Sequence, residues 1–221
     1  MNNQHLKKII SEEVSKPPLA SESIIYCDMD GVLVDFASGA IELANSIISG
    51  QAGEEWLAQS KTMRKSLSQI EPGFVLTSSS DLDIPAVRSL MFAAIGFDPG
   101  GFFASLPPLQ DGIGELWPFI TSLPNQVVLL TAPVGGRKGI EAMTAGDGKK
   151  QWAKEWLQPQ PSNVIISPAR DKANHAGDNS IAHVLIDDKA STIRSWNKTG
   201  YGILHMTGNS SSSITLLKEI L

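Results

Sequence analysis

The sequence predicts an α/β protein with a doubly wound parallel sheet, into which a helical subdomain is inserted near the start. Two observations carry this prediction. Short apolar runs suited to buried parallel strands alternate with helical patterns along most of the chain. About a hundred residues separate the first of these runs from the second, far more than one crossover needs.

Five apolar runs are typical of buried strands. They are residues 24–27 (IIYC), 126–130 (QVVLL), 163–166 (NVII), 183–186 (HVLI) and 202–205 (GILH). Helical patterns lie between and after the later runs, at about 112–122, 149–157, 190–198 and 213–221. This alternation favours helices on both faces of one parallel sheet.

The long gap after the first run contains further helical patterns, near 37–49, 52–67 and 84–95. We therefore expect an α/β core formed by 22–36 and 104–221, with an inserted helical cap at 37–103. Residues 1–21 are expected to be a leader helix and linker, because apolar residues repeat at helical spacing from Leu6 to Val14 before Pro17 and Pro18. Whether the leader packs on the domain or docks to a partner is open.

Composition narrows the function classes. The chain has 221 residues, 42% of them apolar and 19% charged, as in ordinary globular proteins. Its net charge of −5 argues against nucleic acid as a partner. No apolar run approaches the roughly 20 residues of a membrane span, so we expect no membrane partner and a cytoplasmic location. Cys27 is the only cysteine, which excludes an intramolecular disulfide. The sequence does not determine the oligomeric state, and a homodimer is one of the alternatives.

Polar residues follow three of the expected strands. Asp28 and Asp30 follow the first strand, Thr131 follows the second, and Asp187 with Asp188 follows the fourth. Carboxyl ends of parallel strands meet at one edge of a sheet, where ligands bind. Crowded carboxylates repel one another without a cation, and Mg²⁺ prefers such oxygen ligands. The sequence therefore predicts a Mg²⁺ site at this edge.

Four sequence motifs resemble those of the haloacid dehalogenase superfamily of phosphotransferases. They are DMDGVLVDF at 28–36, LLTAP at 129–133, LIDD at 185–188 and a lysine upstream of the last. The resemblance covers most of the chain after about residue 22. It implies a Rossmann-like core with an inserted cap, and hydrolysis of phosphomonoesters through an aspartyl-phosphate intermediate with Mg²⁺ as cofactor.

The resemblance also implies roles for individual residues. Asp28 is similar to the nucleophile and Asp30 to the general acid and base. Thr131 resembles the phosphate-binding hydroxyl, and Asp187 with Asp188 resembles the metal-binding acids, which Asp28 and Asp30 join. Gly31 allows a tight turn, so that backbone N–H groups such as those of Met29 and Ala132 can approach the phosphate.

The phosphate-clamping lysine has three candidates, Lys149, Lys150 and Lys172. Lys172 is favoured, because it follows the third expected strand and therefore lies at the same sheet edge as the acids. Lys149 and Lys150 open the expected helix at 149–157, and Lys149 is retained as a substrate-binding candidate. The glycine-rich segment from Ala132 to Gly148, with Arg137 and Lys138, is expected to be a loop that either folds over a ligand or is only mobile.

A narrower resemblance is to the type C 5′-nucleotidases, which include the 5′(3′)-deoxyribonucleotidases. It rests on DMDGVLVDF, on GFDPGGFFASLPPLQDG at 96–112 and on RDK at 170–172. It implies that Phe36 and Phe97 stack on the base and that Arg170 lies beside the phosphate. Ala132 departs from the pattern, since the family usually has serine there. The scattered histidines His5, His175, His183 and His205 lack ligand spacing.

We therefore expect a 5′-nucleotidase that releases phosphate from (deoxy)nucleoside monophosphates, with a small-molecule phosphate ester as its partner. One alternative keeps the mechanism but changes the substrate to a sugar phosphate or a nucleic-acid terminal phosphate. Another is a phosphate-binding module without turnover. Base and sugar preference cannot be predicted from these residues.

Overall fold

The computed structural model describes residues 19–133, 140–177 and 180–221. They form two compact units. The core unit consists of the described residues up to Val34, with Pro108–Ala132 and Ala153–Leu221. The helical unit consists of Asp35–Pro107 and the described residues from Pro133 to Trp152. Most of the predicted leader, and Arg137 with Lys138, lie outside the described residues.

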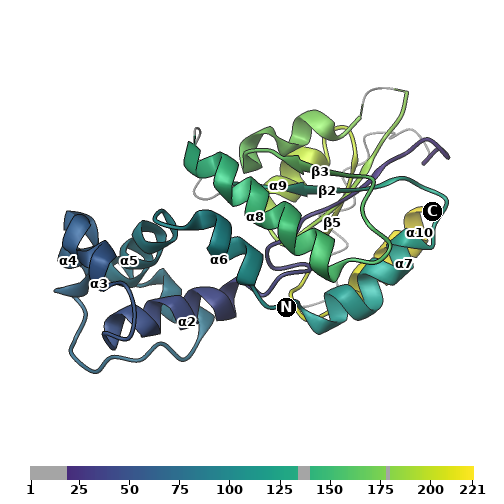
Figure 1. The fold of residues 1–221 in the computed structure, drawn as a ribbon. Helices are drawn as coiled ribbons and strands as arrows, with labels where there is room; N and C mark the ends of the chain where they lie inside the picture. Colours follow the sequence, from purple (N-terminus) through teal and green to yellow (C-terminus); the bar gives the residue numbers. More distant parts are fainter. Residues whose placement is uncertain (1–18, 134–139, 178–179) are drawn as a thin grey trace. The chain divides into compact units, whose positions relative to one another are not determined.

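The core unit contains a five-stranded sheet in which all neighbouring strands pair in parallel. Its strands are β1 (Ile25–Cys27), β2 (Val127–Thr131), β3 (Asn163–Ile166), β4 (Val184–Asp187) and β5 (Tyr201–Leu204), drawn in Figure 1. These bounds confirm the predicted fold class, and each strand lies within about one residue of the expected run. The spatial order is β3-β2-β1-β4-β5.

This order places a topological switch at the centre of the sheet. From β1 the chain runs outward through β2 to β3, and it then returns to the other side of β1 to form β4 and β5. In open α/β sheets the crevice for ligands lies at such a switch, outside the carboxyl ends of the strands. Here the switch separates β1 from β4, the strands that Asp28 follows and Asp187 ends.

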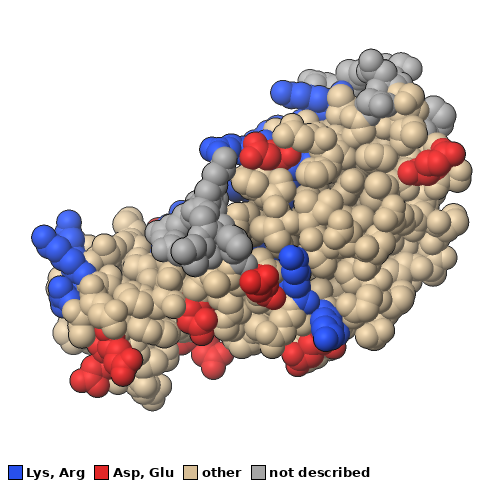
Figure 2. All heavy atoms as spheres, turned by 45° about the horizontal axis from the view of Figure 1, so that its top comes forward, with Lys and Arg blue, Asp and Glu red and all other residues tan. Residues whose placement is uncertain are grey.

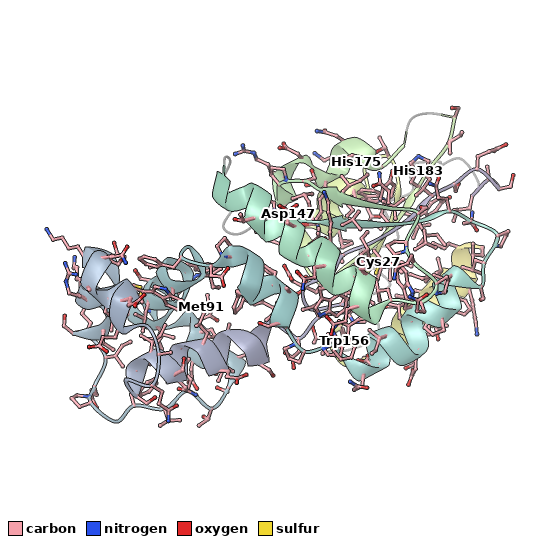
Figure 3. All side chains as sticks on the ribbon, viewed as in Figure 1. Cys27, Met91, Asp147, Trp156, His175 and His183 are labelled. Carbon is pink, nitrogen blue, oxygen red and sulfur yellow. The ribbon has the colours of Figure 1, made fainter. Side chains whose placement is uncertain are left out.

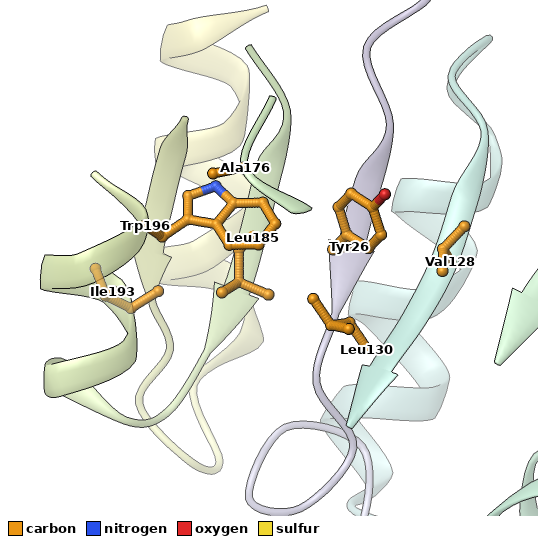
Figure 4. Close-up of a cluster of buried hydrophobic side chains, with 7 residues drawn as sticks. All are labelled: Tyr26, Val128, Leu130, Ala176, Leu185, Ile193 and Trp196. Carbon is orange, nitrogen blue, oxygen red and sulfur yellow. The ribbon is translucent and has the colours of Figure 1, made fainter. Parts of the chain in front are cut away.

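One face of the sheet is covered by a buried apolar cluster. Figure 4 shows Tyr26 on β1, Leu185 on β4 and Trp196 on α9 (Ala190–Trp196) among its members. The indole N–H of Trp196 donates to the His183 carbonyl at 3.1 Å, so this large side chain is buried without losing its hydrogen bond. Side chains alternate across a strand, so Ile25 and Cys27 point to the opposite face.

The remaining helices of the core unit are short. They are η2 (Gly112–Leu116), α7 (Trp117–Thr121), η4 (Ala169–His175) and α10 (Ser210–Ile220). η2 continues directly into α7, so the expected helix at 112–122 is present in two parts. α10 begins three residues earlier than expected, since the Asn209 side chain accepts from the Ser212 N–H and caps it.

The helical unit forms its own core. Its elements are α2 (Phe36–Ile48), α3 (Glu54–Gln59), α4 (Lys61–Leu67), η1 (Ser79–Asp83), α5 (Pro85–Ile95) and α6 (Pro99–Ser105). Ile47, Met63 and Leu90 belong to one buried cluster within it. Figure 3 labels the buried Met91 among these helices, and Cys27 in the core unit. The range predicted for the inserted cap, residues 37–103, therefore lies within the helical unit.

Two helix predictions were wrong in their bounds. The pattern at 52–67 is two helices, because extended Ser60 interrupts it and its hydroxyl accepts from the Met63 N–H to cap α4. The expected loop to Gly148 is mostly helix, since α8 runs from Ile140 to Trp156. A Cβ on Gly148 would overlap the Gly100 carbonyl oxygen, so this glycine serves close packing with α6.

In the part of the chain that the structure describes, no helix is long and apolar enough to cross a membrane. On the face drawn in Figure 2, lysine and arginine side chains form separate groups interspersed with acidic ones.

Candidate active site

The candidate site lies at the carboxyl ends of β1 and β4. Asp28 directly follows β1, and its backbone N–H donates to the Ile186 carbonyl at 2.9 Å, which continues the pairing of the two strands. Asp187 is the last residue of β4. Strand pairing thus sets the two aspartates at equivalent levels of neighbouring strands, on the ligand-binding edge of the sheet.

A buried lysine joins these two carboxylates. Lys172 Nζ lies 2.8 Å from Asp28 Oδ2 and 2.7 Å from Asp187 Oδ2. Relative exposure is 1% for Lys172, 0% for Asp187 and 7% for Asp28. Removing one member of a buried, hydrogen-bonded ion cluster leaves an uncompensated charge, which is strongly unfavourable. Of the three lysines considered, the structure brings Lys172 to the acids.

The remaining carboxylate oxygens are held by backbone donors. Asp28 Oδ1 accepts from the Met29 N–H at 2.8 Å, and Asp187 Oδ1 accepts from the Lys189 N–H at 2.8 Å. These bonds fix the orientation of both carboxylates before any ligand arrives. Such preorganisation is what a site needs to stabilise charge without reorganising during a reaction.

The site has more negative charges from its aspartates than positive charges from Lys172, and this excess shifts the pKa values of the aspartates upward. Burial and the neighbouring Asp28 raise the pKa of Asp187 to about 6, although Lys172 acts against the rise. Asp188 is exposed at the edge of the cluster, but partial desolvation of its carboxylate and the charges of Asp28 and Asp187 raise its pKa to about 7. Lys172 has a raised pKa, because the two carboxylates outweigh its burial, so it stays protonated.

Three carboxylates form a candidate metal site. One oxygen from each of Asp28, Asp187 and Asp188 lies within 4.8 Å of the others. With three carboxylates against one lysine, the cluster carries an excess of two negative charges when all are ionised. An all-oxygen donor set with this charge fits a hard divalent cation such as Mg²⁺. Predicted ligand Asp30 is not in this group, although its charge contributes to the raised pKa of Asp188.

The turn after Asp28 depends on Gly31. The Met29 carbonyl accepts from the N–H groups of Val32, Leu33 and Val34, which folds the chain tightly back. Gly31 has φ +76°, a conformation that favours glycine, and a Cβ there would overlap the Asp188 carboxylate. Gly31 therefore both closes the turn and leaves room for Asp188.

The other predicted core residues occupy different environments. Thr131 is buried at the end of β2, and its carbonyl accepts from the Ser167 N–H. Ala132 follows it, half-buried. Arg170 lies two residues before Lys172 on η4, but its side chain is largely exposed, with Nε 3.8 Å from Asp171 Oδ1. Among the ion pairs of the described residues, Arg170 contacts none of the site carboxylates Asp28, Asp187 and Asp188.

Three predicted residues belong to the helical unit. The Phe36 ring lies 5.8 Å from that of Phe102 and 6.2 Å from that of Phe103. Phe97 is 37% exposed and stacks on Trp56 at 5.8 Å with planes 12° apart. Lys149 is fully buried, and its ammonium lies 4.4 Å from the centre of the Phe103 ring. The predicted roles of these residues in substrate binding stay predictions.

Sequence reasoning missed the loop after β5. The Thr207 hydroxyl donates to the Gly31 carbonyl at 2.8 Å and so ties that loop to the turn after β1. The only available signal was position, since Thr207 follows the last expected strand at the same sheet edge. Buried His205 lies in this loop too, hydrogen-bonded through Nδ1 to the Ser213 hydroxyl at 2.9 Å.

Comparison with known proteins supports the fold. No protein-family model matches the sequence, and no curated protein matches it. A haloacid dehalogenase-like hydrolase structure from Xanthomonas campestris is 11% identical, with a TM-score of 0.52 over 93% of this chain and 97% of that one. A haloacid dehalogenase-like hydrolase from Streptococcus pneumoniae is 16% identical, with a TM-score of 0.47 over 88% and 90%. The chain thus has a fold like that of the haloacid dehalogenase-like hydrolases.

Replacing Gly31 tests whether its lack of a side chain matters for the metal site. Gly31→Ala should weaken Mg²⁺ binding about tenfold or more, because the new methyl group displaces Asp188. Gly208→Ala is the matched control, since Gly208 has φ +78° in the same unit but nothing within 4 Å. It should cost only backbone strain, about 1 kcal/mol. Calorimetric Mg²⁺ titration decides, and equal affinities in the two variants would contradict this role.

Raised carboxyl pKa values make the stability of the metal-free protein depend on pH. A pKa raised on folding stabilises the fold below the unfolded value, and this contribution is lost as pH rises through the folded value. With the pKa of Asp188 near 7, the melting temperature in EDTA should fall between about pH 4.5 and 7.5, and Mg²⁺ should restore it. The lowered pKa of His205 has the opposite effect on stability, so the loss is measured as the difference from a variant that keeps His205 but lacks Asp188.

Asp188→Asn is the control for this pH effect. It removes the titrating group and should flatten the decrease in EDTA between about pH 4.5 and 7.5, as measured by circular dichroism. A difference in melting temperature between the wild type and Asp188→Asn that stays constant over this range in EDTA would contradict the proposed origin.

Proposed function

We propose that this protein is a Mg²⁺-dependent phosphomonoester hydrolase in which Asp28 is the nucleophile. One observation carries the proposal: at the carboxyl end of the central strand, a buried aspartate is oriented by its own turn and paired with a buried lysine beside two further acids. The haloacid dehalogenase-like fold and the motifs at 28–36 and 185–188 support it.

In the first step, an oxygen of Asp28 attacks phosphorus, and the bond from phosphorus to the leaving alkoxide oxygen breaks. Asp30 donates a proton to that oxygen, which gives the free alcohol and an aspartyl phosphate. In the second step, Asp30 takes a proton from water as the water oxygen attacks phosphorus. The acyl-phosphate bond breaks, so inorganic phosphate leaves and the Asp28 carboxylate is restored.

Other groups of the chain supply positive charge and donors. Lys172, which stays protonated, carries a charge that can partly compensate that of the phosphoryl oxygens beside Asp28. Thr131 and the backbone N–H groups of Met29 and Ala132 are the proposed phosphate donors. Asp28, Asp187 and Asp188 would hold Mg²⁺, with Asp30 nearby. When bound, this ion reduces the repulsion between the carboxylate and the phosphate dianion.

Within this class we assign nucleoside monophosphates as the substrates. The support is the resemblance of the motifs to the type C 5′-nucleotidases and the presence of exposed Phe97 in the helical unit. Stacking on an aromatic ring tolerates many bases, because every base has a π-face.

The test of the hydrolase function uses Asp28→Asn, which keeps the size of the side chain but removes its nucleophilic charge. Phosphate release should fall to background, a loss of about 10³-fold or more for a covalent nucleophile. Asp171→Asn is the control, because Asp171 is half-buried on η4 and its carboxylate has a single ion pair among the described residues, at 3.8 Å from Arg170 Nε. Release from nucleotides, sugar phosphates and 3′-phosphorylated oligonucleotides is measured with Mg²⁺ and with EDTA.

Wild-type protein that releases phosphate from no member of this panel would favour a binding module. Enzyme-like release that persists in pure Asp28→Asn protein would show that another residue is the nucleophile. The ranking of the three substrate classes then identifies whether the nucleotide assignment or one of its alternatives holds.

Phe97→Ala tests the nucleotide assignment separately. It should lower kcat/KM for a nucleoside monophosphate about tenfold and leave p-nitrophenyl phosphate nearly unchanged, because only the base loses a stacking partner. Phe119→Ala is the control, since Phe119 is half-buried on α7 in the core unit. The measurement is the ratio of the two kcat/KM values in each folded protein. An unchanged ratio in Phe97→Ala would mean that Phe97 serves packing alone.

A further inference from the structure

A pocket lies entirely within the helical unit. Its volume is about 490 Å³, within the range of small-molecule sites. The walls come from α2, α3, α5 and α6 and from the segment that follows α6. Leu43, Ala94, Ile95 and Leu106 make much of the lining apolar. Because all lining residues belong to one compact unit, the pocket is a property of that unit itself.

Two aromatic rings line the pocket, and each is supported by further rings of the same unit. Trp56 stacks on Phe97 at 5.8 Å. Phe102 contacts Phe36 at 5.8 Å and Phe103 at 5.2 Å, both edge to face. These contacts restrict the indole and the Phe102 ring before a ligand binds, which lowers the entropic cost of binding against them.

The charged lining is of one sign. Glu42 on α2 and Asp98, the N-cap of α6, are the ionisable residues among those that line the pocket, and no lysine, arginine or histidine of the described ranges lines it. Asp98 is held in place, because its Oδ1 accepts from the Gly101 N–H at 2.9 Å. Lys149, which lies over the Phe103 ring, is not part of the lining.

We propose that this pocket binds a small organic ammonium ion, with the charged nitrogen beside Glu42 and Asp98 and the apolar part against Trp56 and Phe102. Aromatic faces attract cations, and carboxylates add a Coulomb attraction that a neutral ligand lacks. A hard metal ion fits less well, because it needs about six oxygen ligands and most of this lining is apolar. An anionic ligand would be repelled by both acids.

None of the residues that line this pocket has a role in the proposed reaction, although the predicted base-stacking rings Phe97 and Phe36 contact Trp56 and Phe102 from outside the lining. The test measures binding of phenethylamine to the full chain by isothermal titration calorimetry at neutral pH. Its isosteric alcohol, 2-phenylethanol, has the same ring without the charge. The amine should bind about tenfold more tightly than the alcohol, and added NaCl should reduce the difference.

Substitutions identify the groups responsible. The double variant Glu42→Gln and Asp98→Asn should abolish the preference for the amine and leave the affinity for the alcohol unchanged, since asparagine can still cap α6. Glu71→Gln is the control, because Glu71 is an exposed acid of the same unit outside the pocket. It should retain the full preference. Trp56→Ala should weaken binding of both ligands.

Three results would overturn the proposal: equal affinity for the amine and the alcohol, no binding of the amine at millimolar concentration, or a preference that survives in the double variant. Asp28→Asn should bind the amine as the wild type does. A failure of the hydrolase assignment would therefore leave this measurement unaffected, and the two proposals can be judged separately.

Discussion

The sharing of one buried lysine between two aspartates is the interaction on which the candidate site depends. Asp28 and Asp187 lie on neighbouring strands, where two ionised carboxylates would repel each other strongly in a poorly hydrated environment. The Lys172 ammonium lies at hydrogen-bonding distance from both carboxylates and reduces the repulsion between them. Because β3 and β4 lie on opposite sides of β1, the chain between them must cross the sheet, and η4 brings Lys172 to the acids within that crossing.

The strands were predictable because each is a short, mostly apolar run, fully buried in β1, β2 and β4, and its end is marked by a polar residue. That same signal located Asp28 and Asp187, since a residue that ends a parallel strand must lie at the binding edge. Helix bounds were harder. Pro99, Gly100 and Gly101 are typical of a turn, yet Asp98 and Pro99 are also the capping pair that starts α6.

The sequence could not predict contacts between segments that come together only in the folded chain. Lys172 could be preferred to Lys149 and Lys150 from its place after a strand, but its sharing between two acids could not. Likewise, the sequence motif predicts a turn at Gly31, but it does not show that a side chain at this position would overlap the Asp188 carboxylate. The stacking of Phe97 on Trp56 joins residues about forty positions apart, with no periodic signal between them.

The electrostatics of the candidate site favour the binding of a divalent cation. Lys172 offsets one of three clustered charges, so the crowding of the acids leaves an unfavourable excess that raises the pKa values of Asp187 and Asp188. Replacing both acids with neutral residues would relieve this cost but remove the ligands. A cation bound here would relieve this repulsion, so the binding energy of the proposed Mg²⁺ would come from the same repulsion that is present in the metal-free fold. A protein that does not use a cation here would gain stability by losing these acids, so their crowding at the edge of the sheet is itself an argument for a functional site.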